Sequence, residues 1–448
     1  MTGSASFSSM VARVYATRLL QFACTVAVAF LLARLLGPDG RGVYSLLLLL
    51  PSTLFAIGQL GLPSALTFFA GAGRSLRSLV VAAIGLGATL GGLLLIAAMV
   101  ALPSLQPMLF SAAPLQLLQV ATLALPIQLA ASFFGSILWG RQLVGPYSRV
   151  LAVQSVGWLL AVAGLVGIGG LGVEGALAGY LLVTGGGAAA VVALVLRERA
   201  READKDGADG AAHEPVGVGS LLGYGLRLYP AGLTTFLSYR ADLFLLSALR
   251  GDAAAIGLYA LAVSFAEISF QVPDSVATVL YPRVAGTERA DADRMAPSMA
   301  RFTLLVTVVA ALALIPLAWL AIRIVLPAFE GSLMPFLILL PGTVALGLSK
   351  VLSGYISGLG RPEPVSAIAA TALAMNLLVN VILIPPLGIA GAALASMTSY
   401  TLHAILTIGL ASRLSGAPYR DFISPGRAEL RRLVDRLAAL VPGRNLER

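Results

Sequence analysis

The stretch GRGVYSLLLL at residues 40–49 has a counterpart about 215 residues further along the chain, AIGLYALAVS at residues 255–264. Tyr44 falls on Tyr259 at this offset. Nearly the same offset aligns three further places: Pro126 with Pro341, Pro146 with Pro362, and the pair Gly172 and Gly175 with Gly388 and Gly391. Helices rich in Gly and Ala match one another by chance at single places, but one offset at four separated places favours a duplicated chain. The sequence therefore predicts two parallel repeats related by an axis along a membrane normal.

The composition places both repeats in a membrane. Of the 448 residues, 58% are hydrophobic and 11% are charged, whereas soluble domains have roughly 25% charged residues. With about 20 apolar residues per crossing, we predict an all-α polytopic membrane protein with about twelve transmembrane helices in two six-helix lobes. The predicted spans are 12–36, 43–70, 78–102, 115–139, 148–169, 175–196, 221–249, 256–282, 302–326, 333–357, 365–385 and 388–412.

The basic residues give an orientation. With both termini in the cytoplasm, 22 of the 30 Lys and Arg residues lie on the cytoplasmic side, which is the bias that the positive-inside rule describes. The net charge of +9 is thereby explained without a nucleic-acid partner. One cysteine, Cys24, and two distant histidines, His213 and His403, are too few for a disulfide framework or a Cys/His metal site.

These observations predict four regions. Residues 1–196 form an N-lobe, 197–220 a charged cytoplasmic linker, 221–412 a C-lobe, and 413–448 a cytoplasmic tail. Within the tail, RAELRRLVDRLAALV at 427–441 has helical apolar spacing with arginines off the apolar stripe, which is typical of an amphipathic helix on an anionic membrane surface.

Seven ionisable residues lie more than three residues inside the ends of the predicted spans, and such residues normally face a wet or protein-lined interior. They are Arg18, Arg227, Arg240, Asp242, Glu267, Asp274 and Lys350. Arg18, Arg227 and Lys350, in the cytoplasmic half, either snorkel to the interface or line a cavity for an anionic head group. Arg240, Asp242 and Glu267, nearer the middle, form either an ion pair between the seventh and eighth spans or a gate or coupling site. Asn376 and Asn380 share one face of the eleventh span and are expected to hydrogen-bond across helices.

Three stretches carry a family resemblance: residues 31–69, residues 241–262 and residues 354–400, with the pattern NxxxNxxLIPxxGxxGAAxA at 376–395. The chain resembles the polysaccharide transporter (Wzx-like) branch of the multidrug/oligosaccharidyl-lipid/polysaccharide exporter superfamily. The bacterial members of that branch include flippases for lipid-linked O-antigen and exopolysaccharide.

This resemblance implies a function. The chain is expected to be a multi-pass transporter of the bacterial inner membrane, not an enzyme, that moves an undecaprenyl-pyrophosphate-linked oligosaccharide to the outer leaflet by alternating access. Arg18 and Arg227, with Lys350 and Arg240, are then expected to line the pyrophosphate site, and Asp242 matches an acidic position of the family. Glu267 and Asp274 join Asp242 as coupling or gating residues by inference from their charge. No cofactor is expected beyond coupling to a proton or monovalent cation gradient. The expected partners are the lipid-linked oligosaccharide, membrane lipids and the polysaccharide polymerase machinery.

Three other functions remain open at this point. A cation-coupled multidrug antiporter of the same superfamily would favour an acidic cavity, whereas the embedded charges sum to a positive value. A lipid II flippase has fourteen helices, and twelve spans are countable here. An integral-membrane glycan polymerase or ligase would present catalytic groups on a large external loop, and the predicted external loops are short and nearly uncharged.

Overall fold

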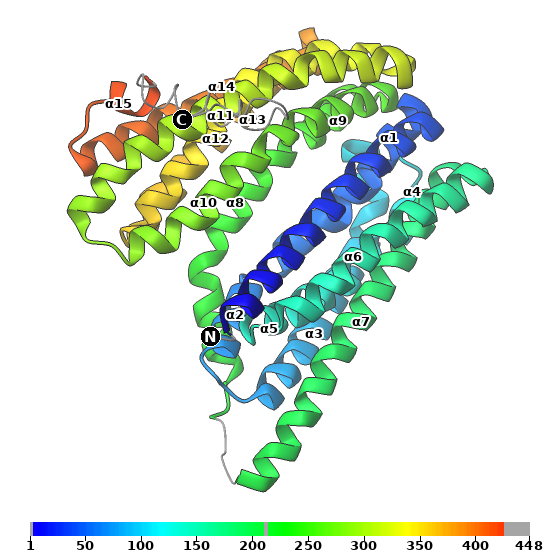
Figure 1. Ribbon diagram of the computed structural model, residues 1–448. Helices are drawn as coiled ribbons and strands as arrows, with labels where there is room; N and C mark the ends of the chain where they lie inside the picture. Colours follow the sequence, from blue (N-terminus) through cyan, green and yellow to red (C-terminus); the bar gives the residue numbers. More distant parts are fainter. Residues whose placement is uncertain (1–2, 210–213, 425–448) are drawn as a thin grey trace, which may run out of the picture. The chain divides into compact units, whose positions relative to one another are not determined.

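The computed structural model describes residues 3–209 and 214–424, and this part of the chain is helical almost throughout, without strands (Figure 1). The chain divides at residue 260 into two compact units. The predicted fold class, an all-α membrane protein with two lobes, is confirmed. The predicted amphipathic helix at 427–441 lies outside the described residues.

The first unit holds eight α-helices and the start of a ninth. They are α1 (Gly3–Gly58), α2 (Leu62–Gly71), α3 (Leu76–Leu109), α4 (Leu115–Thr122), α5 (Ala124–Gly140), α6 (Val144–Ala161), the π-helical turn η1 (Val162–Ile168), α7 (Gly172–Asp209), α8 (Val218–Arg250) and α9 (Ala253–Glu267). A core of apolar side chains from α2, α3 and α5, among them Leu66, Leu79 and Phe133, holds the helices together.

The second unit begins within α9. It continues with η2 (Ile268–Phe270), α10 (Gln271–Ala285), α11 (Arg289–Leu320), η3 (Ala321–Val325), η4 (Pro327–Ser332), α12 (Leu333–Gly358), α13 (Pro362–Leu387), α14 (Ile389–Ser415) and α15 (Arg420–Ile423). Its core packs α10, α11 and α12 against α14 and α15, with Tyr355, Ile356 and Phe422 fully buried.

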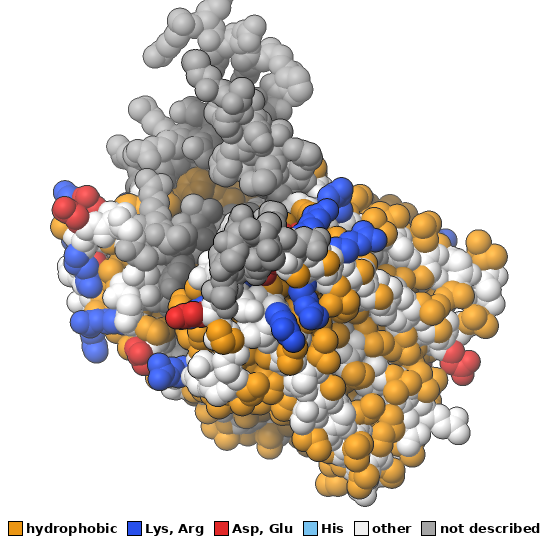
Figure 2. All heavy atoms as spheres, turned by 90° about the horizontal axis from the view of Figure 1, so that it is seen from below, with side chains coloured by type: hydrophobic (Ala, Val, Ile, Leu, Met, Phe, Trp, Pro, Cys, Tyr) orange, Lys and Arg blue, Asp and Glu red, His pale blue; other side chains and the backbone are white. Residues whose placement is uncertain are grey.

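Ten of the helical segments in the described chain are long and apolar enough to cross a membrane. Two features explain the difference from the twelve predicted spans. The segment Ala16–Gly58 joins most of the first predicted span to most of the second across Gly37, where the backbone is not helical, so two helices separated by a kink count as one. The seventh predicted span forms α8, but Arg227, Arg240 and Asp242 lower its hydropathy, so it is absent from the ten. Large apolar side chains such as Val100 and Ile168 are exposed on the helices, and Figure 2 shows Lys and Arg side chains standing among hydrophobic ones on one face. This surface is that of a multi-pass membrane protein.

Glycines with a positive φ recur between the two halves at about the offset found in the sequence. Gly37, inside α1, has a φ of 65°, and Gly251, between α8 and α9, has a φ of 62°. Gly172 at the start of α7 and Gly388 before α14 have φ values of 54° and 58°. Glycine adopts a positive φ without the steric cost that a side chain adds, so each pair places a glycine at corresponding breaks in the helices, although ψ differs between Gly37 (−178°) and Gly251 (14°).

The two halves of the sequence touch closely at Gly42 of α1 and Gly257 of α9, which are themselves related by the offset of 215. A Cβ atom on Gly257 would collide with the carbonyl oxygen of Pro38, and one on Gly42 would collide with that of Ala253. A second contact of this kind joins Gly61, before α2, to Gly225 of α8. Glycine at these positions allows backbone to approach backbone.

The predicted linker is largely helical in the described residues. α7 runs on to Asp209 through a segment rich in Glu, Arg and Ala, which are good helix formers. An ion pair of 2.7 Å between Arg141 and Glu202 ties this extension to the end of α5. The lobe boundaries predicted from the sequence, at residues 196 and 221, stay a prediction. The division into compact units, which lies at residue 260, is a separate property of the fold.

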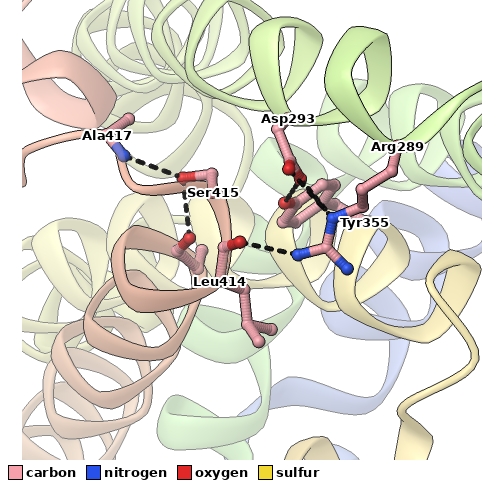
Figure 3. A network of polar contacts seen from close by, with 7 residues as sticks. Arg289, Asp293, Tyr355, Leu414, Ser415 and Ala417 are labelled. Atoms are coloured by element: carbon pink, nitrogen blue, oxygen red, sulfur yellow. Dashed lines mark hydrogen bonds and ion pairs between the residues drawn. The ribbon is translucent and has the colours of Figure 1, made fainter.

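At one end of the second unit, a polar network joins three helices (Figure 3). Arg289 of α11 donates to both carboxylate oxygens of Asp293 at 2.9 Å and to the carbonyl oxygen of Leu414 at the end of α14 at 2.6 Å. The hydroxyl of Tyr355, from α12, donates to the same Asp293. Because all three groups have partners, we interpret this cluster as structural.

Candidate functional site

Arg18 and Arg227 are both exposed and lie in apolar surroundings. Arg18, in α1, is followed by the exposed Leu19 and Leu20, and Arg227, in α8, lies between the exposed Leu226 and Leu228. Among the described residues, neither guanidinium forms an ion pair or a hydrogen bond. Each arginine therefore offers all its N–H donors to a ligand, beside apolar surface.

The two arginines lie toward the same end of the first unit. The bends at Gly37 and Gly251 mark the opposite end, because the residues that follow them meet in the contact of Gly42 with Gly257. Arg18 precedes Gly37 by 19 residues and Arg227 precedes Gly251 by 24, which correspond to about 29 and 36 Å of helix at 1.5 Å per residue. Both distances are comparable to the bilayer core of about 30 Å, so both arginines fall near the far interface. In Figure 1 the N-terminus and α2 lie at that end.

Asp242 is held within the first unit by a tyrosine of the next helix. Its side chain is 3% exposed, Tyr259 of α9 donates its hydroxyl to Oδ2 at 2.5 Å, and the backbone N–H of Leu243 donates to Oδ1 at 2.8 Å. Arg240 is half-buried, two residues away on the same helix. The seventh and eighth predicted spans are therefore joined by a hydrogen bond from the Tyr259 hydroxyl to the buried Asp242 carboxylate.

Lys350 and Asp274 form an ion pair within the second unit. The Lys350 Nζ lies 2.8 Å from the Asp274 Oδ1 and 4.0 Å from the centre of the Phe270 ring. The lysine side chain is 19% exposed and the aspartate side chain 54% exposed. Glu267 lies at the end of α9 and is half-buried. Lys350, which was predicted to bind the substrate, and Asp274, which was predicted to take part in coupling, thus lie in contact. Their opposite charges offset each other.

Asn376 and Asn380 are fully buried between α13 and α14. The Asn376 side-chain amide donates to the Ser396 hydroxyl at 3.3 Å, and the Asn380 amide donates to the backbone and side-chain oxygens of Asn376 at 2.9 Å. Ser399 of α14 also donates to the carbonyl oxygen of Ala372 at 2.7 Å. The bonds to Ser396 and from Ser399 cross between the two helices, in the geometry of interhelical polar packing.

Arg41 is a further candidate, which the sequence pattern places only among the external basic residues. The structure places it inside α1, four residues after the Gly37 bend and next to the Gly42 contact. Its Nε is buried and has no hydrogen-bond partner among the described residues. Buried donors are normally satisfied, so Arg41 joins the residues that could contact an anion. The position that corresponds to Arg41 in the second repeat is Ile256, so comparison of the repeats does not indicate a role for Arg41.

Comparison with solved structures identifies the architecture. The lipid II flippase MurJ, in an inward closed conformation, matches with a TM-score of 0.73 over 98% of this chain and 94% of its own, at 14% sequence identity. An inward-facing multidrug resistance MATE family transporter of the MOP superfamily matches with a TM-score of 0.66 over 89% of this chain and 95% of its own, at 17% identity. The crystal structure of a MATE point mutant matches with a TM-score of 0.64 over 91% of this chain and 96% of its own, at 16% identity.

The chain has a MurJ/MATE-like fold. No protein-family model matches the sequence, and no curated protein does. At these identities the likeness concerns the fold, and what the chain carries has to be argued from its own residues.

Proposed function

We propose that this chain is a flippase of the polysaccharide transporter branch that moves an undecaprenyl-pyrophosphate-linked oligosaccharide from the cytoplasmic to the outer leaflet of the bacterial inner membrane. In this proposal it works by alternating access and supplies the polysaccharide polymerase machinery. Arg18 and Arg227 grip the pyrophosphate, and coupling to a proton or monovalent cation gradient passes through Asp242.

One observation carries the proposal: the embedded arginines Arg18 and Arg227 are unpaired and the embedded aspartates are not. These two arginines have no polar partner among the described residues, whereas Asp242 accepts from Tyr259 and Asp274 pairs with Lys350. A guanidinium presents a fork of donors that matches phosphate oxygens. Two such groups set in apolar surface suit a lipid with an anionic head group.

The same observation separates the proposal from a multidrug antiporter, the function named for the matching MATE transporter. A site for cationic amphiphiles requires available carboxylates, and here Asp242 is 3% exposed with both oxygens hydrogen-bonded. We therefore favour an anionic cargo.

The decisive variants are Arg18→Ala, Arg227→Ala and the double variant. Each variant is introduced into a strain in which this chain is the sole flippase for the lipid-linked oligosaccharide. The amounts of surface glycan and of lipid-linked sugar are then measured. We expect each single variant to lower surface glycan at least about tenfold, since hydrogen bonds to charged groups contribute about 1.5–3 kcal/mol and about 1.4 kcal/mol is a factor of ten. Lipid-linked sugar is expected to accumulate in the inner leaflet.

Arg34→Ala is the matched control, because Arg34 is an exposed arginine of the same helix α1 near the Gly37 end. It should leave glycan levels unchanged, and membrane abundance should be equal in all variants. Normal glycan in both single variants and the double variant would refute the pyrophosphate role. Purified protein that binds a cationic dye, but not undecaprenyl pyrophosphate, would favour the antiporter instead.

A further inference from the structure

A groove with a volume of about 600 Å³ runs between α6 and α7 in the first unit. One face of α6, including Arg149, Val153 and Gly157, forms one wall, and one face of α7, including Val183, Gly186 and Arg197, forms the other. No residue of α6 is buried and Val153 is 73% exposed, so the groove opens at the surface of the first unit. The groove is separate from Arg18, Arg227 and Asp242, which do not line it.

The length of the groove matches one leaflet of a membrane. The arginines mark one end, and Gly157 and Val183 lie 8 and 14 residues away along their helices. At 1.5 Å per residue these intervals are about 12 and 21 Å, which bracket half of the hydrocarbon core of about 30 Å. Gly186 has no atom within 4 Å of where a Cβ would stand, so the middle of the groove is open to an apolar chain.

The charge at the groove's mouth is positive and uncompensated. Arg149 and Arg197 are exposed, and neither forms an ion pair among the described residues. The neighbouring carboxylates are already engaged, because Glu198 pairs with Arg201 at 3.4 Å and Glu202 with Arg141 at 2.7 Å. Basic pockets between transmembrane helices are typical binding sites for anionic lipid head groups.

We propose that the groove binds one anionic phospholipid of the surrounding bilayer. Its phosphate lies between Arg149 and Arg197, and one acyl chain follows the groove over Gly186 to Gly157. This site is distinct from the proposed cargo residues Arg18, Arg227 and Asp242, which do not line it, and it reaches the depth of a single leaflet.

Native mass spectrometry of the full chain, stripped of lipid in detergent, tests this site with phosphatidylglycerol and phosphatidylcholine as probes. Phosphatidylglycerol should be retained in preference to phosphatidylcholine. A basic residue near a membrane surface contributes about a fivefold gain in binding, so Arg149→Ala and Arg197→Ala should each weaken phosphatidylglycerol binding about fivefold, and the double variant about thirtyfold. Gly186→Leu should weaken both lipids, because it fills the path of the acyl chain.

Two matched controls accompany these variants. Arg199→Ala removes an arginine of the same helix that does not line the groove, and Gly85→Leu adds the same side chain at an open position of α3. Both should bind phosphatidylglycerol as the wild type does, and the apparent melting temperature verifies folding in every variant.

Any of four binding results, or the dimer described below, would overturn the proposal. They are equal retention of the two lipids by the wild type, unchanged binding in the double arginine variant, unchanged binding in Gly186→Leu, and displacement of phosphatidylglycerol by an equimolar amount of undecaprenyl phosphate. The last result would assign the groove to the cargo. A wild-type dimer that Gly186→Leu dissociates would assign it to a second copy of the chain and equally overturn the phospholipid site.

Discussion

Single residues show how the membrane-embedded charges are accommodated. The sequence singled out Asp242 and Lys350 by their cost in lipid, and the structure supplies their partners, a tyrosine hydroxyl for Asp242 and Asp274 for Lys350. Tyr259 was visible in the sequence only as the repeat counterpart of Tyr44. Its contact with Asp242 depends on how α9 packs against α8, which no local pattern encodes.

Tyr259→Phe tests the role of this hydroxyl. The change leaves a buried carboxylate oxygen with one donor fewer, which costs about 1.5–3 kcal/mol for a hydrogen bond to a charged group. We expect a lower apparent melting temperature of the purified protein. Tyr44→Phe is the matched control, since Tyr44 is buried at the repeat-related position and its hydroxyl forms no hydrogen bond among the described residues. Equal melting temperatures for the two variants would show that the bond to Asp242 does not stabilise the fold.

Asp242→Asn separates stability from the proposed coupling. The amide keeps the shape of the carboxylate and an acceptor oxygen for Tyr259 but cannot carry a titrating charge. We expect a folded protein whose export of lipid-linked sugar no longer depends on the ion gradient, measured as surface glycan with and without an uncoupler. Export that keeps the wild-type dependence in Asp242→Asn would exclude this residue as the coupling site.

At the scale of helices, sequence patterns located the elements well and their continuity less well. The predicted spans fall on helices, and the break predicted after residue 36 coincides with the non-helical backbone of Gly37. The second predicted span is interrupted at residues 59–61, between α1 and α2, and α7 runs on into the predicted linker. Apolar composition indicates which residues lie in lipid. The breaks between helices depend instead on a positive φ at single glycines, and the extension of α7 is held by contacts such as the ion pair of Arg141 with Glu202. Composition therefore cannot specify where one helix ends and the next begins.

The contact between α1 and α9 makes a prediction for Gly257→Ala. The added Cβ would collide with the carbonyl oxygen of Pro38, and backbone cannot move aside as a side chain can. Overpacking of this kind typically costs about 1–3 kcal/mol, so the apparent melting temperature should fall. Gly85→Ala, at an open position of α3, should leave it unchanged or slightly higher. A Gly257→Ala protein as stable as Gly85→Ala would mean that the two helices separate readily at this contact.

For the whole molecule, the membrane orientation stays a prediction, and contacts in the first unit join loops that the sequence places on the same side of the membrane. Arg74 of the loop between α2 and α3 forms an ion pair with Glu214, and the Ser75 N–H donates to the Glu214 carbonyl oxygen at 3.0 Å. Both segments are predicted to be cytoplasmic. At the other end, Ser111 contacts Gly251, and both residues belong to predicted external loops. The pairing of loops thus agrees with the predicted alternation of loops between the two sides, and the positive-inside rule predicts which side is cytoplasmic.

Cysteine labelling in intact cells tests this orientation. In a Cys24→Ser background, we expect Ser111→Cys to react with a membrane-impermeant maleimide added outside, and Ala72→Cys to react only after permeabilisation. Both positions are exposed, so accessibility reports the side of the membrane. The opposite labelling pattern would invert the topology and place Arg18 and Arg227 near the outer leaflet.

The sequence alone determined the membrane environment, the positions of the helices and the twofold repeat, because hydropathy and a constant offset between glycines, prolines and tyrosines are properties of the linear chain. Tertiary structure alone decided which charges are neutralised, where backbone touches backbone, and that α6 and α7 leave an open groove at Arg149 and Arg197, which form no ion pair among the described residues. These outcomes depend on which helix faces are brought together, and residues distant in sequence become partners only through packing. The same physical reason leaves Arg18 and Arg227 as the candidate cargo site: the fold gives partners to Asp242, Asp274 and Lys350 and none, among the described residues, to these two arginines.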